Sequence, residues 1–372
     1  MIHFVVPAAH DRMIREYLEL WGRDVASRMR VMHAESLPGT SRFSPGTYVL
    51  AALDQLAPPM AAFVSALHAQ LAGHAGVRFL NHPARSRQRF ALLEELHRRG
   101  QNEFRAFRAT ADLRSLRYPV FVRNESAHDG ALSPLLDSPA AVQAAIGRAV
   151  VQGLPARDLL VVEFCDTADA DGYYRKYSAF VVGDRIVPRS LSYSRDWMLK
   201  FQGSEFSREM VEEERDYVHG NPHEAALRDV FAVAGVQYGR IDYAMKHGRP
   251  QTWEINLNPT IGRGLRPSTG KIPRELDAIR TPTKEHFYRC FRDAWEAVDV
   301  DVAGNDPIDV AIDPAVVRDA TTARRSTDGR RWLAGLRRLA RPVKPLVAPL
   351  VAGALPVVGW LVTRRAGRGE SR

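Results

Sequence analysis

The segment 238–259 constrains the fold most, because it has the pattern of two β-strands joined by a tight turn. We expect strands over 238–245 and 252–255, with His247-Gly248 as the turn between them. Asp242 lies on the first strand and Glu254 on the second, so the hairpin brings two carboxylates to neighbouring strands. Asn256 follows Glu254 by two residues and therefore shares its face, since side chains alternate along a strand.

Two carboxylates and an amide oxygen that converge in this way form a set of hard oxygen ligands. Such a set suits Mg²⁺, whose remaining coordination positions are filled by water and phosphate oxygens. The sequence therefore predicts a metal site at Asp242, Glu254 and Asn256. The alternative is a surface hairpin whose acids are simply solvated.

The rest of the chain predicts an α/β protein with more than one unit. Over residues 1–80, expected strands at 2–6, 48–53 and 78–80 alternate with expected helices at 11–21 and 60–72, which is typical of a small parallel α/β domain. The middle of the chain is richer in strands. There we expect strands at 119–123, 159–164, 174–182 and 185–191, and helices at 87–99, 224–234 and 283–297.

In this setting the run Glu254-Ile255-Asn256-Leu257-Asn258-Pro259, preceded by Asp242, resembles the metal-binding end of the ATP-grasp superfamily. D-alanine–D-alanine ligase, glutathione synthetase and the ribosomal-protein glutamate ligase belong to that superfamily. The resemblance implies an N-terminal α/β domain followed by a two-lobed α+β ATP-grasp module. It also implies ATP as cofactor, with Mg²⁺ (or Mn²⁺) held by Asp242, Glu254 and Asn256.

The resemblance extends to the nucleotide site. Residues 160–164 resemble the strand whose end contacts adenine, which implies nucleotide-binding roles for Glu163, Phe164 and Cys165. Arg123, at the end of the strand 119–123, and Arg89 stand where the family usually has phosphate-contacting lysines. Arginine offers a stronger fork to phosphate oxygens but is bulkier than lysine. ATP binding is therefore expected to survive both exchanges.

Two further cations are implied as catalytic residues. Lys176 is on the strand 174–182, where the family has a cation near the phosphates or the acyl phosphate, and Arg189 lies beyond it. Lys176 and Arg175 face opposite sides by alternation, and Lys176 is favoured. The implied reaction is that of a carboxylate–amine ligase, in which a substrate carboxylate is phosphorylated by ATP and the acyl phosphate is taken by an amine. The substrates are small molecules that the sequence does not identify.

The expected boundaries are 1–80 for the N-terminal domain and 81–300 for the ATP-grasp module, with lobes at 81–160 and 161–300. Residues 301–330 are polar and lack sustained periodicity, so they are expected to form a linker without an apolar stripe that would join them to the core. Residues 331–372 form a basic and apolar tail. Its uncharged stretch 345–362 carries three prolines, which favours contact with a membrane surface over a spanning helix. Packing of the tail on protein is the alternative.

The bulk properties limit the remaining classes of function. The net charge is +9, but many arginines lie in the tail and no nucleic-acid-binding motif accompanies them, so no nucleic-acid partner is expected. Two cysteines and no recognisable secretion signal favour the cytoplasm, with contact at the inner face of the membrane. A catalytically weak ATP-binding protein that regulates or assembles membrane-associated biosynthesis is the second hypothesis.

Overall fold

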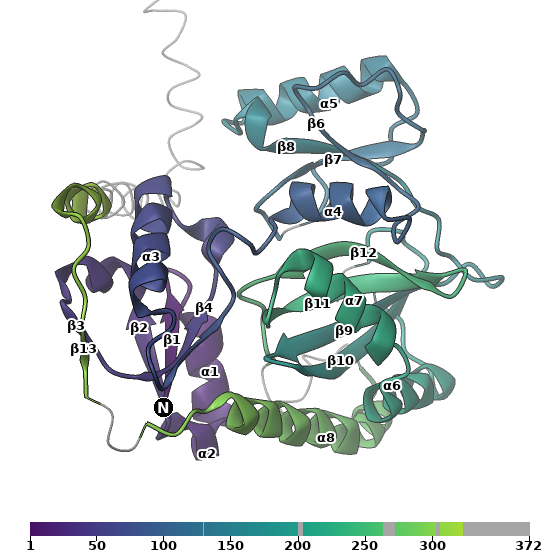
Figure 1. Cartoon of the computed structure of the whole chain (residues 1–372). Helices are drawn as coiled ribbons and strands as arrows, with labels where there is room; N and C mark the ends of the chain where they lie inside the picture. Colours follow the sequence, from purple (N-terminus) through teal and green to yellow (C-terminus); the bar gives the residue numbers. More distant parts are fainter. Residues whose placement is uncertain (129, 200–203, 263–271, 303–305, 323–372) are drawn as a thin grey trace, which may run out of the picture.

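A computed structural model describes residues 1–128, 130–199, 204–262, 272–302 and 306–322. It contains three parts, each built on its own sheet (Figure 1). The N-terminal part has the parallel strand order β2-β1-β4-β5, as the alternation of strands and helices predicted. Its elements are β1 (Ile2–Val6), α1 (Arg12–Leu20), α2 (Arg23–Ala26), β2 (Met29–His33), β4 (Gly46–Leu50), α3 (Pro58–Leu71) and β5 (Val77–Leu80). The strand β2 and the helix α2 were not predicted.

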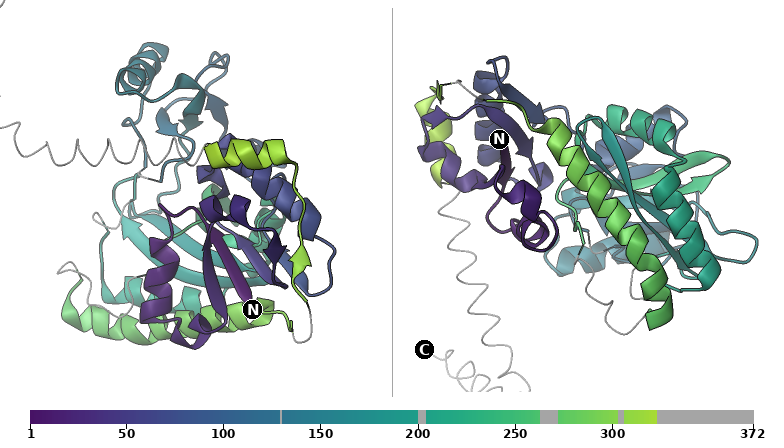
Figure 2. Two further views of the ribbon diagram at one scale, coloured as in Figure 1. Left: turned by 90° about the vertical axis from the view of Figure 1, so that its left-hand side faces the viewer. Right: turned by 90° about the horizontal axis from the view of Figure 1, so that it is seen from below.

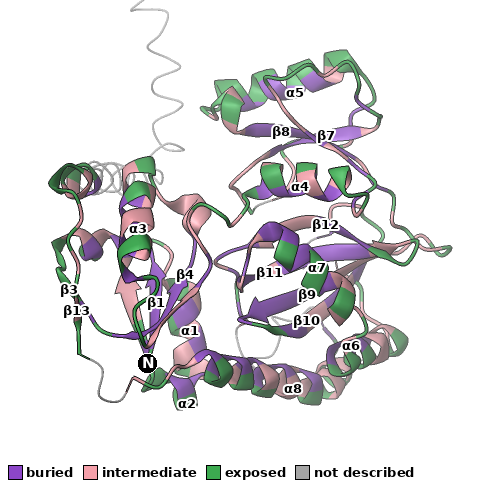
Figure 3. Cartoon of the chain, in the orientation of Figure 1, coloured by how far each residue is buried: buried purple, intermediate pink, exposed green. Residues whose placement is uncertain are grey.

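The second part is a small antiparallel sheet of order β6-β8-β7, and we call it the first lobe. It consists of β6 (Ala106–Arg108), β7 (Val120–Asn124), α5 (Pro139–Val151) and β8 (Leu159–Glu163). Ser138 begins α5 by accepting a hydrogen bond from the backbone N–H of Ala141, with Pro139 in the first turn, although this helix was not predicted. One face of the sheet packs on α5, and Figure 3 shows the outer side of that helix exposed.

The third part, which we call the second lobe, is an antiparallel sheet of order β10-β9-β11-β12. Its alternating residues bury both faces. Phe180 and Val182 pack toward α6 and α8, whereas Ala179 and Val181 pack toward α4 and α7. The elements are β9 (Tyr174–Val182), β10 (Arg185–Ser194), α6 (Arg208–Gly220), α7 (Glu224–Ala234), β11 (Tyr238–Lys246), β12 (Arg249–Asn256) and α8 (Arg274–Val298), with α4 (Arg89–Arg98) between the two lobes.

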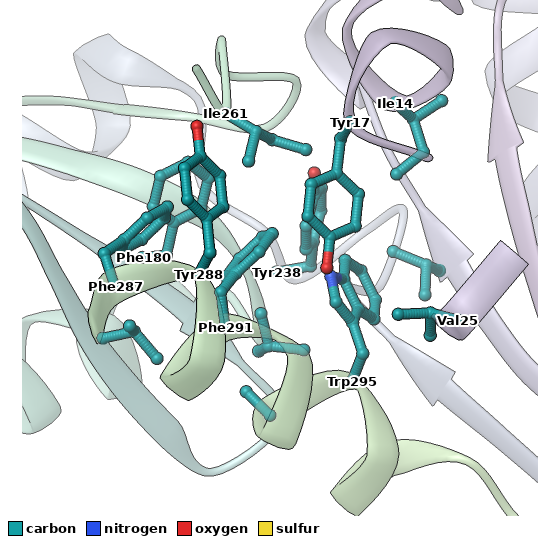
Figure 4. Packing of buried hydrophobic residues seen from close by; sticks show 14 of the residues in the cluster. Ile14, Tyr17, Val25, Phe180, Tyr238, Ile261, Phe287, Tyr288, Phe291 and Trp295 are labelled. Carbon is teal, nitrogen blue, oxygen red and sulfur yellow. The ribbon is translucent and has the colours of Figure 1, made fainter. Parts of the chain in front are cut away.

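The N-terminal domain and the second lobe share one aromatic core, so they are not independent units. The helix α8 runs along the second lobe toward the N-terminal domain (Figure 2). Figure 4 shows Phe291 and Trp295 of α8 beside Tyr17 of α1. The ring centroids of Tyr17 and Phe291 lie 5.2 Å apart, and those of Tyr238 and Trp295 lie 5.3 Å apart. This shared core fixes one wall of the cavity described below relative to the N-terminal domain.

The expected fold class is confirmed, but the expected linker is wrong over residues 308–322. The short strand β13 (Ile308–Asp309) pairs with β3 (Arg42–Phe43) of the N-terminal domain. Helical residues 314–322 follow beside α3 (Figure 2) and bury Ala320 completely in the core of that domain. The pairing could not be predicted from the sequence, because β13 is only two residues long and its partner strand lies far away in the chain. The tail from residue 331 onward lies outside the described residues.

No helix in the described part of the chain combines the length and the apolar character that crossing a bilayer requires.

Candidate active site

A cavity of about 530 Å³ lies between the first and second lobes. Side chains alternate along β7, so Phe121 and Arg123 face the second lobe while Val120 and Val122 pack toward α5. The opposite wall is formed by the ends of β9, β11 and β12. From the two lobes and their connecting loops, the cavity is lined by Phe121, Arg123, His128, Gly130, Phe164, Cys165, Thr167, Tyr174, Arg175, Lys176, Trp197, Met198, Leu199, Arg240, Asp242, Trp253, Glu254, Asn256 and Thr260.

The structure brings the three predicted metal ligands together. Asp242 on β11 lies directly opposite Glu254 on β12, next to a register shift, and both line the cavity with Asn256. Each group already has partners within the protein. Glu254 Oε2 accepts hydrogen bonds from Nη2 of Arg89 and, at 2.9 Å, from Nη2 of Arg123. Burial alone would raise the pKa of Glu254, but the positive charges of His128, Arg89 and Arg123 hold it well below its ordinary value.

The two arginines that replace the expected lysines have different roles. Arg123 lines the cavity and is positioned for a ligand. Arg89 does not line it. Its Nη1 donates to the backbone carbonyls of Asn124 and Ala127, both at 2.9 Å, and to that of Glu125. Arg89 is therefore a buried organiser of the loop after β7, and its predicted contact with nucleotide is not supported by its position.

His128 in the same loop was missed by the sequence analysis. Its Nε2 lies 3.6 Å from Oδ2 of Asp54 in the N-terminal domain, and its Nδ1 lies 3.8 Å from Oε2 of Glu254. Burial opposes protonation, but these two carboxylates outweigh it and raise the pKa of His128 to about 9. His128 is therefore a cation at neutral pH. A lone histidine in a loop gave no sequence signal for this role, because both partners are distant in the chain.

Of the two predicted catalytic cations, Lys176 is in the cavity and Arg189 is not. Lys176 Nζ lies 3.8 Å from Oδ2 of Asp242 and 3.3 Å from the carbonyl oxygen of Leu199. The neighbouring Arg175, which also lines the cavity, is held by Asp169 and Glu213. Arg189 lies under α8, with its guanidinium 4.6 Å from the centroid of the Phe287 ring. The prediction for Arg189 is thus wrong in position, because this residue shares the face of β10 that α8 covers.

Arg240 supplies a cation that the sequence analysis overlooked. Its Nε donates to Oδ1 of Asp242 at 2.9 Å, and its Nη1 donates to the carbonyl oxygen of Thr260 at 3.2 Å. Arg240 precedes Asp242 by two residues on β11, so the alternation of side chains could have identified it.

Of the residues predicted to contact the nucleotide at the end of β8, Phe164 and Cys165 line the cavity, but Glu163 does not. Its carboxylate is buried between Arg105 and Arg117, whose Nη2 atoms lie at 2.5 and 2.7 Å. Burial would raise the pKa of Glu163, but these two arginines lower it to about 2. Leu160 and Val162 face the second lobe, so alternation sends Glu163 to the other side of the sheet. The side chain of Glu163 is therefore structural.

An aromatic region forms the other end of the cavity. The ring of Trp197 lies 5.0 Å from that of Phe121 and 5.8 Å from that of Phe164, measured between centroids. Trp253 of β12 also lines the cavity and packs, like Trp197, against the apolar cluster that contains Phe121 and Cys165. Neither tryptophan was predicted, because Trp197 reaches the cavity from a loop and Trp253 was not distinguished from a core residue. The cavity therefore has flat apolar walls at one end and cations at the other.

The arrangement does not fit a magnesium ion as it stands. Asp242 and Glu254 are both engaged by guanidinium groups, and Oδ1 of Asn256 accepts the backbone N–H of Asn258 at 2.8 Å. Within the described ranges, no group of three or more His, Cys, Asp or Glu side chains is placed to hold a metal ion. A metal ion would have to displace arginines from their carboxylates, so the predicted metal role of Asp242, Glu254 and Asn256 stays a prediction.

Comparison with known proteins adds structural neighbours only. No protein-family model matches the sequence, and no curated protein matches it. Among solved structures, the chain is similar to the D-alanine–D-alanine ligase of Bacillus anthracis complexed with ATP, at 10% identity and a TM-score of 0.43, over 80% of this chain and 99% of that one. It is also similar to a RimK domain ATP-grasp protein of Sphaerobacter thermophilus, at 15% identity and a TM-score of 0.41, over 78% and 98% of the two chains.

A third similar structure is the L-amino acid ligase of Bacillus licheniformis, at 12% identity and a TM-score of 0.39, over 79% of this chain and 73% of that one. The neighbours thus include ligases and a protein described as ATP-grasp, the class that the motif around Glu254 resembles. The three-part α/β architecture predicted from that resemblance is the one observed. At these TM-scores the likeness carries no argument about the reaction, which depends on the cavity itself.

Proposed function

We propose that the chain is an ATP-dependent ligase that activates a substrate carboxylate as an acyl phosphate and joins it to an amine. One observation carries this proposal: a single cavity between two lobes is aromatic at one end and cationic at the other. A purine base suits the rings of Phe164 and Trp197, and a polyphosphate suits Arg123, Lys176 and Arg240. The volume of the cavity, about 530 Å³, lies in the range of small-molecule binding sites.

The proposed chemistry needs no protein nucleophile. A carboxylate oxygen attacks the γ-phosphorus of ATP, the bond from that phosphorus to the bridging oxygen breaks, and ADP leaves. The amine nitrogen then attacks the acyl carbon, inorganic phosphate leaves with the electrons of the broken C–O bond, and the nitrogen loses a proton to solvent. The residues contribute by position and charge, since Arg123 and Lys176 hold the transferring phosphoryl group and stabilise its negative charge.

ADP release tests this proposal. Purified protein incubated with ATP and pools of amino acids and hydroxy acids is expected to release ADP only when both a carboxylate and an amine are present. Lys176→Met is expected to lower that rate by about 100-fold, because one preorganised cation near the transferring group is removed. Arg185→Gln, at an exposed position on β10 outside the cavity lining, is the matched control and should keep the rate. ADP release independent of added acceptors would contradict the ligase assignment.

The same assay distinguishes the second hypothesis, a nucleotide-binding protein with little catalytic activity. The engagement of Glu254 by two arginines favours it, because a carboxylate held in this way is not free to hold the metal ion that the family's reaction uses. Tight ATP binding without ADP release in the presence of any of the amino-acid or hydroxy-acid pools would support a nucleotide-binding protein with little catalytic activity.

We also propose that the basic and apolar tail, residues 331–362, contacts anionic membrane surfaces. This proposal rests on the sequence, in which basic residues are followed by an uncharged stretch. The full chain is expected to sediment with anionic vesicles and to be partly released by high salt, whereas a protein that ends after residue 322 should remain in the supernatant. A full chain that ignores the vesicles would leave the tail without this role.

A further inference from the structure

The cationic end of the cavity carries more positive side chains than its carboxylates neutralise. Four cations meet around the two carboxylates Asp242 and Glu254: Arg123, Lys176 and Arg240 line the cavity, and Arg89 lies behind its wall. Taking the proposed function as given, we infer that this chain binds the polyphosphate of a nucleotide without a divalent metal ion, because guanidinium groups occupy the carboxylates and supply the charge that a metal would bring.

The first step concerns the carboxylate of Glu254. Its side chain is only 13% exposed, and the same oxygen accepts from Arg89 and Arg123 while His128 lies beside it. Arg89 cannot move away cheaply, since its other nitrogen holds three carbonyls of the loop after β7. A dication entering here would meet the two guanidinium charges at close range and would have to break a buried ion pair. Glu254 is therefore the counter-ion of the arginines.

The second carboxylate is occupied in the same way. Arg240 contacts both oxygens of Asp242, with Nε 2.9 Å from Oδ1 and Nη2 3.3 Å from Oδ2. Nζ of Lys176 lies 3.8 Å from the same Oδ2. A guanidinium has five N–H donors, and the contacts of Arg240 with Asp242 and Thr260 use three of them. Arg240 and Lys176 can therefore donate to phosphate oxygens at the cavity wall without an intervening metal.

Arg123 is the residue with most to gain from an anion. It is buried, its Nε has no hydrogen-bond partner in the described structure, and it shares one carboxylate oxygen with Arg89. Two guanidinium groups share the single negative charge of Glu254, and a phosphate oxygen beside Arg123 would supply a second. A phosphate whose charge is already neutralised by a metal ion would do so less well.

The experiment measures ATP affinity of the full chain with Mg²⁺ and, separately, in excess EDTA. Trp197 and Trp253 line the cavity, so intrinsic fluorescence reports occupancy, and calorimetry checks it. We expect the two dissociation constants to agree within about threefold, a difference of less than about 1 kcal/mol. An affinity at least about tenfold weaker in EDTA would overturn the inference and leave the proposed function standing. No binding under either condition would overturn both.

A variant sharpens the comparison. Arg123→Met removes one guanidinium that is inferred to contact phosphate. The affinity of this variant for ATP in EDTA is therefore expected to fall at least about tenfold, which corresponds to the loss of one charge-assisted contact. Arg123→Lys keeps the charge and serves where the methionine variant does not fold, with an expected loss in EDTA of smaller size. Arg185→Met is the control and should bind as the parent does. Equal affinity of Arg123→Met and the parent in EDTA would contradict the role given to this guanidinium.

Discussion

Replacing Glu254 by glutamine is expected to lower the free energy of unfolding by about 3–5 kcal/mol, the usual cost of removing one partner from a buried ion pair. The amide keeps the size of the side chain but loses its charge, so Arg89 and Arg123 remain buried together with no neutralising carboxylate between them. Chemical denaturation of the variant and the parent, followed by tryptophan fluorescence, measures the difference.

The matched control is Glu213→Gln, which also removes a carboxylate from an arginine. The side chain of Glu213 is 43% exposed and pairs with Arg175 at 2.9 Å, so the expected cost is at most about 1 kcal/mol. A role for Glu254 as a metal ligand alone would give the opposite result, namely a variant with an intact fold and impaired turnover. Equal stability of Glu254→Gln and the parent would show that solvent reaches the arginines. It would contradict the assignment of Glu254 as their counter-ion.

The hairpin around Asp242 and Glu254 shows what the sequence could predict. Both strands and the turn at His247-Gly248 are present, and the two acids lie opposite each other. Local features were sufficient here, since strand periodicity and turn residues act within about twenty residues of chain. The same holds for α7 and β9, whose bounds agree with the expected ranges.

The partners of the charged residues could not be predicted in the same way. Glu163 was assigned to the nucleotide, but Arg105 and Arg117 of the same lobe enclose it on the far side of the sheet. Arg89 was assigned to phosphate, but it binds a loop that starts 35 residues later. Motif order identifies which residues gather near a site. The hydrogen-bond partner of each side chain depends on tertiary contacts, which a local sequence pattern does not predict.

The segment 308–322 leads to the second large expected effect, because its contacts with the N-terminal domain replace the linker expected there. Ile308 lies opposite Phe43, and the N–H of Val310 donates to the carbonyl of Ser41 at 2.8 Å. Ala320 is fully buried. Five further side chains are partly buried against the same core, namely Ile308, Val310, Ile312, Val316 and Val317.

A protein that ends after residue 302 is therefore expected to be less stable than one that ends after residue 322. At about 1 kcal/mol for each half-buried apolar side chain, the loss is roughly 5 kcal/mol. It should lower the melting temperature by about 10 °C, since 1 kcal/mol corresponds to about 2 °C at the upper end of the domain sizes for which this relation is known. Thermal unfolding of the two truncated forms measures the effect of residues 303–322 alone, because both lack the tail. The full chain should melt with the longer form. Equal melting of the two truncated forms would mean that this segment only rests on the N-terminal domain, as a linker would.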